Sequence, residues 1–293
     1  MVRSVLNGKI VRLLPGVVLG ILAACTGGLR DIPDREPVPA APARRVVFIG
    51  LDGLGAAYLS RADMPVVKRM IREGASSLHV KNVLPTNSWP NWSSLFRGAP
   101  PERNGEENFP TIFSVLRDQG RGKRAVFFYE WSGLRDICRD HSADMRDIQT
   151  DMAAAAEIAA YIAEEKPDLT VVVFNEPDST GHSERWGSGA YYAKLRELDG
   201  LMGLIEQGVK DGGFYDSTVF VISADHGGIL WGHGFNTPRQ RNVPLIVYGR
   251  GIRKGLVIQS PLGICDIAPT MAVILGLGIP EEWTGRPIME VFE

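Results

Sequence analysis

The chain has few cysteines, no marked excess of charge of either sign and no long hydrophobic run in its folded part. Its 293 residues include 32 Lys and Arg against 34 Asp and Glu, a formal net charge of −2. Nothing in this balance indicates a protein that binds nucleic acid through a strongly basic surface. With 44% hydrophobic residues and no internal repeat, the composition is that of an ordinary globular protein with enough length to bury a core.

Residues 1–25 have the layout of a secretory signal, in which basic residues precede the short apolar stretch LLPGVVLGILAA. This stretch is too short to span a bilayer comfortably. It ends in LAAC, which resembles the lipobox of bacterial lipoproteins and implies cleavage before a lipid-bearing Cys25. Thr26 follows in place of an aspartate, which favours the outer membrane by resemblance to the Gram-negative sorting pattern. We expect an exported, periplasm-facing lipoprotein, with an ordinary cleaved signal or an uncleaved anchor as alternatives.

Residues 26–44 are rich in Gly, Pro and Ala and predict a flexible tether, because they offer little apolar surface to bury. Residues 45–293 then form a single domain. The other two cysteines, Cys138 and Cys265, lie far apart in the sequence. An oxidising compartment would allow them to pair, but the apolar surroundings of Cys265 favour buried free thiols.

Strand-like and helix-like segments alternate along the folded part, which predicts a doubly wound α/β/α sandwich with a mostly parallel central sheet. Val-, Ile- and Phe-rich runs predict strands at 46–51, 76–84, 124–130, 169–175, 217–224 and 243–249. Helical spacing, Pro and Gly predict helices at 65–74, 110–120, 151–167, 191–208 and 265–278.

Three of the apolar runs are followed by an acid: Asp52, Asp178 and Asp225. Ligands of open α/β sheets bind beyond the carboxyl ends of the strands, so these acids predict one shared site. His182 lies four residues after Asp178, and one helical turn would place both side chains on the same face.

Histidine is scarce, and three of the five histidines lie near these acids: His182, His226 beside Asp225, and His233 in WGHGFN. Mixed imidazole and carboxylate ligands fit zinc best, with manganese or iron as alternatives. A single such residue is more often a surface group or a cap, but the whole set predicts a metal site.

The segment LPTNSWPNWSSLFRG supplies candidate hydroxyl groups at Thr86, Ser88, Ser93 and Ser94. A hydroxyl held against a divalent cation can ionise near neutral pH. An amide such as Asn91 can donate to a phosphoryl oxygen as charge develops there. The alternative is a turn followed by a capped helix, and both can hold because a helix N-terminus also favours an anion.

The segments LDG, PTNSWPNW, NEPDSTGH and SADHGG, in this order, resemble the alkaline phosphatase superfamily. The similarity is greatest to its nucleotide pyrophosphatase/phosphodiesterase branch, which carries P-T-x-T-F-P-N, E-P-D-x-x-G-H and D-H-G. The resemblance runs from about Val46 to the C-terminus. It implies two divalent ions, zinc with manganese as the alternative, and a small-molecule phosphoester substrate hydrolysed through a phosphoserine intermediate.

Transferred by position, the resemblance implies a role for each candidate residue. Ser88 matches the nucleophile, although the family has Thr there, and Asn91 matches a phosphate-binding asparagine. The implied ligands are Asp52, Asp225, His226 and the Ser88 oxygen for one metal, and Asp178, His182 and His233 for the other.

Several alternatives to a phosphodiesterase remain at this stage. A phosphomonoesterase would need basic residues, for which Arg97 and Arg103 are candidates, and a phosphonate hydrolase or a headgroup transferase would share the site. A sulfatase is disfavoured because the motif that starts at Ser88 has no Arg at its fifth position. A lipid-anchored binding or scaffold protein is the non-enzymatic alternative. Five aromatic residues could line a substrate wall or pack in the core: Trp89, Trp92, Phe109, Trp131 and Trp186.

Overall fold

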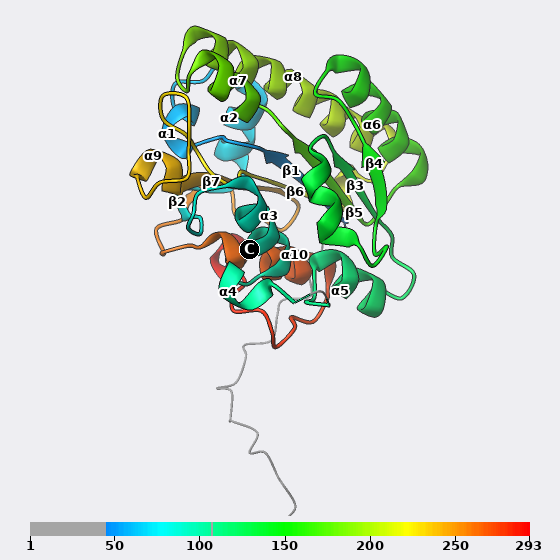
Figure 1. Cartoon of the computed structure of the whole chain (residues 1–293). Helices are drawn as coiled ribbons and strands as arrows, with labels where there is room; N and C mark the ends of the chain where they lie inside the picture. Colours follow the sequence, from blue (N-terminus) through cyan, green and yellow to red (C-terminus); the bar gives the residue numbers. More distant parts are fainter. Residues whose placement is uncertain (1–44, 107) are drawn as a thin grey trace, which may run out of the picture. The chain divides into compact units, whose positions relative to one another are not determined.

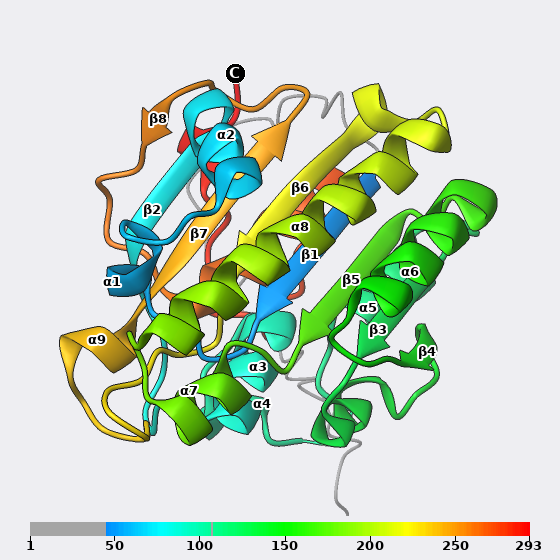
Figure 2. The same ribbon diagram turned by 90° about the horizontal axis from the view of Figure 1, so that it is seen from above.

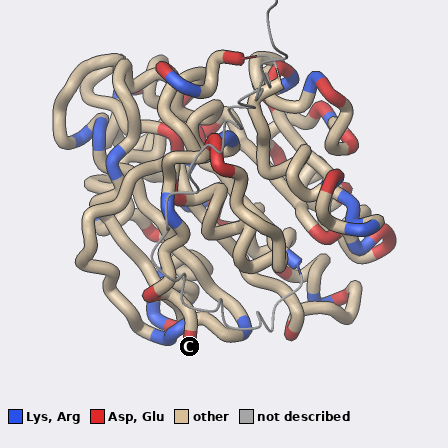
Figure 3. Tube along the Cα trace, turned by 90° about the horizontal axis from the view of Figure 1, so that it is seen from below, with Lys and Arg blue, Asp and Glu red and all other residues tan. Residues whose placement is uncertain are grey.

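A computed structural model describes residues 45–106 and 108–293. The predicted signal at 1–25, the tether at 26–44 and the lipid on Cys25 lie outside the described residues. Among the helices of the described ranges, none combines the length and the apolar composition needed to cross a membrane. Acidic and basic residues are interspersed over the described trace (Figure 3).

The described residues form one eight-stranded sheet in the order β4-β3-β5-β1-β6-β7-β2-β8. β7 runs antiparallel to both of its neighbours, and the other strand pairs are parallel. The predicted mostly parallel sheet is therefore confirmed. The strands are β1 (Arg45–Leu51), β2 (Ala75–Lys81), β3 (Ala125–Tyr129), β4 (Asp144–Asp147), β5 (Leu169–Phe174), β6 (Thr218–Ser223), β7 (Asn242–Gly249) and β8 (Leu256–Val257).

Helices cover both faces of the sheet and complete the predicted three layers (Figures 1 and 2). One face carries α2 (Pro65–Glu73), α6 (Met152–Glu165) and α8 (Gly189–Asp211), and the other carries α3 (Ser88–Arg97), α5 (Ile112–Gln119) and α10 (Ile267–Leu275). The shorter helices are α1 (Ala56–Leu59), α4 (Pro101–Asn104), α7 (Asp178–Glu184) and α9 (Pro238–Arg241), with 3₁₀ turns η1 (Ser132–Cys138), η2 (Tyr215–Ser217), η3 (Ile264–Asp266) and η4 (Met289–Val291).

The central strands are apolar throughout because helices cover both of their faces. Every residue of β5 and β6 is buried, as is β1 after its first residue. Phe96 of α3 packs against Phe48 of β1 and Phe127 of β3, with ring centroids 5.4 and 5.5 Å apart. These contacts hold α3 against β1 and β3, so Ser88, which begins α3, has a defined position relative to the sheet.

Local capping explains where several helices begin. Thr111 and Ser114 form a capping box at α5, and Asp151 and Ser188 cap α6 and α8 through their side chains. The start of α2 has no such cap of its own. Instead, buried Asp199 of α8 accepts hydrogen bonds from two backbone N–H groups in the first turn of α2, each at 2.9 Å, which ties the two helices together.

The strand β4 is absent from the sequence prediction because the segment DMRD has no apolar alternation. As an edge strand, β4 pairs only with β3, so its charged side chains can remain in solvent. Cys138 is a buried free thiol, as the sequence favours, whereas the free thiol of Cys265 is only half-buried.

Candidate metal centre

The first cluster lies at the carboxyl ends of two neighbouring strands and consists of Asp52, Asp225 and His226. Asp52 follows β1 and the other two follow β6, which pairs with β1 in parallel. All three are buried, and one ligand atom of each lies within 4.8 Å of the others. His226 Nε2 is 3.5 Å from Asp52 Oδ1 and 3.3 Å from Asp225 Oδ2. We call this the buried cluster.

The second cluster consists of Asp178, His182 and His233, and it reaches the surface. Asp178 begins α7, and His182 one turn later places Nε2 3.4 Å from Asp178 Oδ2, as the predicted helical spacing requires. His233 Nε2 lies 3.6 Å from Asp178 Oδ1 and 3.1 Å from His182 Nε2. We call this the surface cluster. The structure thus brings together all six Asp and His residues that the sequence singled out.

Gly53 allows the two clusters to lie side by side. Its φ of +75° favours glycine, and a Cβ at this position would lie 2.8 to 2.9 Å from atoms of Asp178. The Asp178 N–H donates to the Asp52 carbonyl oxygen at 2.9 Å, and the Gly53 N–H donates to Asp225 Oδ1 at 3.1 Å. Glycine is therefore needed here both for its backbone conformation and for the close approach.

Each of the three histidines holds its Nδ1 against a backbone carbonyl oxygen. The pairs are His182 with Trp231 at 2.9 Å, His226 with Gly227 at 3.1 Å and His233 with Thr86 at 2.8 Å. Because a carbonyl only accepts, the neutral imidazole carries its proton on Nδ1, and the Nε2 lone pair faces the acids. Metal-binding histidines are oriented in this way by a partner on the other ring nitrogen.

The electrostatics of the site also fit bound cations. Burial, with added repulsion from Asp52 and Asp225, raises the pKa of Asp178 to about 9. Burial raises the pKa of Asp52 to about 7, where Asp225 adds to the shift, and burial likewise raises that of Asp225 to about 7. Asp178 Oδ1 and Asp225 Oδ2 are buried without a hydrogen-bond partner. Divalent cations would supply the missing counter-charge and ligand contacts.

Ser88 is the candidate hydroxyl that the structure places at the buried cluster. It begins α3, with Oγ 3.1 Å from His226 Nε2 and 3.4 Å from Asp52 Oδ1. The other candidates point elsewhere: Thr86 bonds the segment around Gly234, and Ser93 and Ser94 bond Asn104. Ser88 is therefore both the first residue of a helix and the hydroxyl group at the cluster, so both alternatives considered from the sequence hold.

The prediction for Asn91 needs correction. Its side chain is fully buried. Its amide donates to carbonyl oxygens at 2.9 Å (Asn87) and 3.2 Å (Pro85), and its Oδ1 accepts from the Val83 N–H at 2.7 Å. These bonds occupy the amide within the loop, so Asn91 holds the Ser88 loop in shape instead of facing a phosphoryl oxygen.

The sequence did not predict the supporting roles of Trp92, Thr86 and Gln240. Trp92 Nε1 donates to Asp52 Oδ2 at 3.0 Å, and its spacing of one helical turn from Ser88 was the available signal. Thr86 Oγ1 accepts from the Gly234 N–H at 2.8 Å, and Gln240 Oε1 accepts from the Phe235 N–H, also at 2.8 Å. Buried Thr86 and Gln240 thus position the segment that carries His233. No sequence pattern predicts that these two side chains bind this segment.

The five aromatic residues considered for a substrate wall are mostly structural. Trp92, Phe109 and Trp186 are buried, Trp131 is half-buried and Trp89 is partly exposed. Trp186 donates to the Gly53 carbonyl oxygen at 2.9 Å and lies edge-on to His182 with centroids 5.0 Å apart. Its contacts support the surface cluster from behind.

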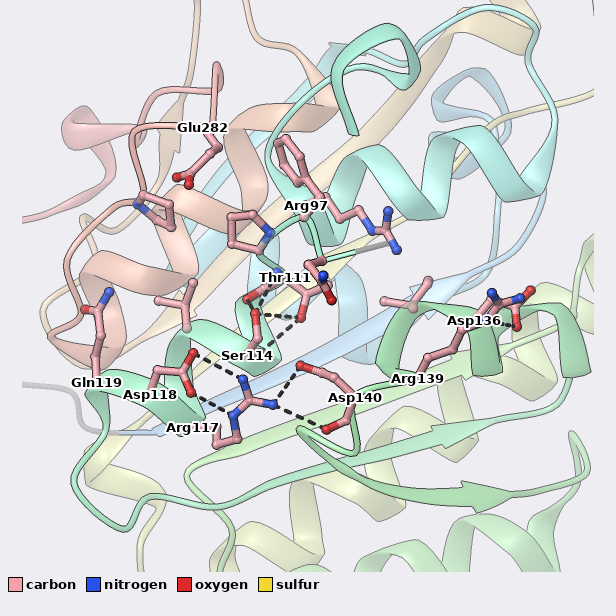
Figure 4. A pocket seen from close by; sticks show the side chains of 16 residues that line it. Arg97, Thr111, Ser114, Arg117, Asp118, Gln119, Asp136, Arg139, Asp140 and Glu282 are labelled. Atoms are coloured by element: carbon pink, nitrogen blue, oxygen red, sulfur yellow. Dashed lines mark hydrogen bonds and ion pairs between the residues drawn. The ribbon is translucent and has the colours of Figure 1, made fainter. Parts of the chain in front are cut away.

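A cavity of about 380 Å³ lies away from both clusters, between α5, η1 and the segment near Pro280 (Figure 4). Five of its charged side chains pair with one another: Arg117 contacts Asp118 and Asp140, each at 2.7 Å, and Arg139 contacts Asp136 at 2.8 Å. It contains none of the cluster residues, so its size does not make it the reactive centre.

The model of the type I phosphodiesterase/nucleotide pyrophosphatase family matches residues 46–109 and 113–229, more than half of the chain. The chain belongs to this family. The match contains Ser88 and the ligand candidates up to His226, whereas His233 lies beyond it. The assignment of His233 therefore rests on the sequence resemblance and on its position in the surface cluster.

The chain is also similar to curated proteins. The chain is 26% identical over 215 residues to bis(5'-adenosyl)-triphosphatase enpp4 of Mus musculus, covering 63% of this chain and 47% of the relative. It is 25% identical to GPI ethanolamine phosphate transferase 1 of Emericella nidulans, covering 88% of this chain and 35% of the relative. The chain therefore spans less than half the length of these two curated relatives.

Solved structures share the fold. Murine ectonucleotide pyrophosphatase/phosphodiesterase 5, an inactive form in complex with AMP, superposes with a TM-score of 0.73 at 13% identity, covering 85% of this chain and 100% of that chain. A phosphonate monoester hydrolase from Silicibacter pomeroyi superposes with a TM-score of 0.64 at 15% identity, covering 83% and 75%. The alkaline-phosphatase-like architecture expected from the sequence is thus confirmed.

Proposed function

We propose that the protein is a two-metal phosphodiesterase or nucleotide pyrophosphatase that acts through a phosphoserine intermediate. The observation that carries this proposal is the Ser88 hydroxyl, held beside the buried cluster while the surface cluster lies next to it. A nucleophile beside two adjacent Asp and His ligand sets suits in-line displacement at phosphorus.

Each cluster would hold one divalent ion, zinc with manganese as the alternative. The ligands would be Asp52, Asp225, His226 and the Ser88 oxygen in the buried cluster, and Asp178, His182 and His233 in the surface cluster. Bound there, the ions would supply Lewis acidity that favours the ionised hydroxyl and offsets the charge on the phosphoryl oxygens.

Ser88 Oγ would attack phosphorus, and the bond from phosphorus to the leaving ester oxygen would break. The N-terminus of α3 would favour the anionic phosphoryl group, because its first backbone N–H groups lack helical partners. Water would then attack the phosphoserine, restoring the Ser88 hydroxyl and releasing phosphate or a monoester. Trp92 and the carbonyl partners of the histidines keep the reacting groups in position.

A phosphomonoesterase receives less support from the position of Arg97. A monoester carries an additional negative charge, which basic residues near the nucleophile would offset. Arg97 lies nine residues after Ser88 on α3, about 13 Å along a helix. Its guanidinium donates to the Asn104 and Glu106 carbonyl oxygens, so it is engaged away from the nucleophile.

The deciding experiment compares bis-p-nitrophenyl phosphate with p-nitrophenyl phosphate on zinc-loaded protein. We expect faster turnover of the diester, with about two zinc ions per chain. Faster turnover of the monoester would overturn the diesterase assignment. A native protein that carries no metal and turns over neither compound would instead favour the scaffold alternative.

We also propose that Cys25 carries lipid and that the domain faces the periplasm from the outer membrane. The support is the LAAC sequence after a signal-like N-terminus. Labelled palmitate should be incorporated into the full chain and not into a Cys25→Ala variant. Equal labelling of the two would contradict the anchor.

A further inference from the structure

The segment that carries His233 exposes three large apolar side chains. Leu230, Trp231 and Phe235 are 56%, 58% and 69% exposed, respectively. We call these three residues the apolar rim. Exposed large apolar side chains that lie close together in the chain are candidates for a contact surface, and these three lie within three residues of His233, a candidate metal ligand.

The backbone of the rim runs from the surface cluster to the Ser88 loop. At one end the Trp231 carbonyl oxygen accepts from His182 Nδ1 at 2.9 Å, and at the other the Phe235 carbonyl oxygen accepts from Thr86 Oγ1 at 3.1 Å. Thr86 lies two residues before Ser88. Both views show the segment between β6 and α9 passing beside α7 (Figures 1 and 2).

The rim is held in an exposed position by buried polar contacts. Thr86 and Gln240 are fully buried, and Gln240 bonds the backbone on both sides of His233 through the Phe235 N–H at 2.8 Å and the Gly232 carbonyl oxygen at 3.3 Å. A backbone fixed in this way presents its side chains without a large ordering cost when a ligand binds.

The site opens on the side of the rim. The buried cluster is closed to solvent, whereas the His182 side chain is 47% exposed and contacts the rim backbone. An ester group on a phosphoryl group bound at the clusters can leave the site past the surface cluster, where the Trp231 carbonyl oxygen contacts His182. The occupant that this position fits is the organic part of the substrate itself.

The geometry points to the apolar rim as the subsite for an apolar or aromatic ester group of the phosphodiester, which makes Trp231 and Phe235 specificity-determining residues. This inference rests on the proposed function. Burial of the exposed rings against such a group would favour it over a short alkyl group at the same phosphorus.

The test uses two diesters with the same leaving group, phenyl p-nitrophenyl phosphate and methyl p-nitrophenyl phosphate. The wild-type protein should prefer the phenyl ester in kcat/KM, and the double variant Trp231→Ala/Phe235→Ala should reduce this preference by about tenfold. Val257→Ala is the matched control. Val257 is 61% exposed, but it lies on the edge strand β8 beside the start of β2, away from the carboxyl ends of β1 and β6. An equal loss on both diesters would overturn the subsite.

A binding measurement separates this inference from the proposed reaction. Calorimetry of zinc-loaded protein should give tighter binding of phenylphosphonate than of methylphosphonate, and the double variant should bind the two alike. This preference would support the rim even if neither diester were hydrolysed, an outcome that would remove the proposed function alone. Equal binding of the two phosphonates by the wild type would overturn the rim. If the double variant lost binding to phosphatidylethanolamine vesicles but kept the preference for the phenyl compounds, the apolar rim would be a membrane contact instead of a substrate subsite.

Discussion

The buried cluster and the surface cluster are built from the same residue types but stand in different surroundings. Asp52, Asp225 and His226 follow central strands and are closed to solvent, whereas His182 and His233 come from a short helix and a surface segment. The sheet enforces the first geometry through many backbone bonds. The second depends on a few side-chain contacts, chiefly those of Thr86 and Gln240. We therefore expect the surface cluster to exchange its ion more readily and to be more sensitive to its supporting residues.

The largest effect should come from Ser88, which would link the two clusters through the phosphoryl group. Ser88→Ala should lower kcat by about four orders of magnitude or more, because the nucleophile is lost, while the Asp and His ligands of each cluster still hold their ions. Steady-state kinetics and metal analysis check this. Ser88→Thr is the matched variant and should keep measurable turnover. Wild-type turnover in Ser88→Ala would remove Ser88 from the reaction.

Metal-ligand substitutions should separate the clusters directly. During dialysis of the wild type against a chelator, we expect two phases of zinc loss, the faster one from the surface cluster. His182→Ala should remove the fast phase and Asp225→Asn the slow one, each leaving about one ion per chain. Time-resolved metal analysis measures both phases. A single phase in the wild type, or loss of both ions in His182→Ala, would contradict independent clusters.

Each substitution of a supporting residue should lower the zinc affinity of only one cluster, by about 10–100-fold. Thr86→Val removes the hydroxyl contacts with Gly234 and Phe235 and should affect the surface cluster. Trp92→Phe removes the donor to Asp52 but keeps an aromatic ring beside Phe96, and it should affect the buried cluster. Competition with a zinc indicator measures the two affinities.

Thr86→Ser is the control for the first of these changes, because it keeps the hydroxyl and should restore the affinity of the surface cluster. If Thr86→Val and Trp92→Phe lowered the zinc affinity of the same cluster, the assignment of Thr86 to the surface cluster and Trp92 to the buried cluster would be wrong.

The smallest effect on chemistry should come from Asn91. Asn91→Ala leaves the Val83 N–H without its partner and should lower the free energy of unfolding by about 1–3 kcal/mol. Denaturant unfolding measures the change. Turnover per folded, metal-loaded molecule should fall far less than in Ser88→Ala. An equal fall, without loss of stability, would return Asn91 to contact with the phosphoryl group.

Most strands and longer helices were predictable because their residues carry the signal locally. The fully buried runs of β1, β5 and β6 are read from Val, Ile and Phe, and α6 from its alanines. The edge strand β4 was not predictable, since pairing on one side only leaves its charged residues in water. The short helices α1, α4 and α9, four residues each, contain too few residues to show a period.

The sequence by itself determined the identities of the candidate reactive groups: three acids and three histidines near strand ends, and a serine at a helix start. Tertiary structure decided which way each of them faces. Asn91 and Ser88 lie three residues apart, yet packing turns one into the loop and the other toward His226. Gln240 acquires its role only because folding brings it against Thr86, 154 residues away. Residue type and local spacing are encoded along the chain, but burial and long-range hydrogen bonds exist only once the sheet and its loops have assembled.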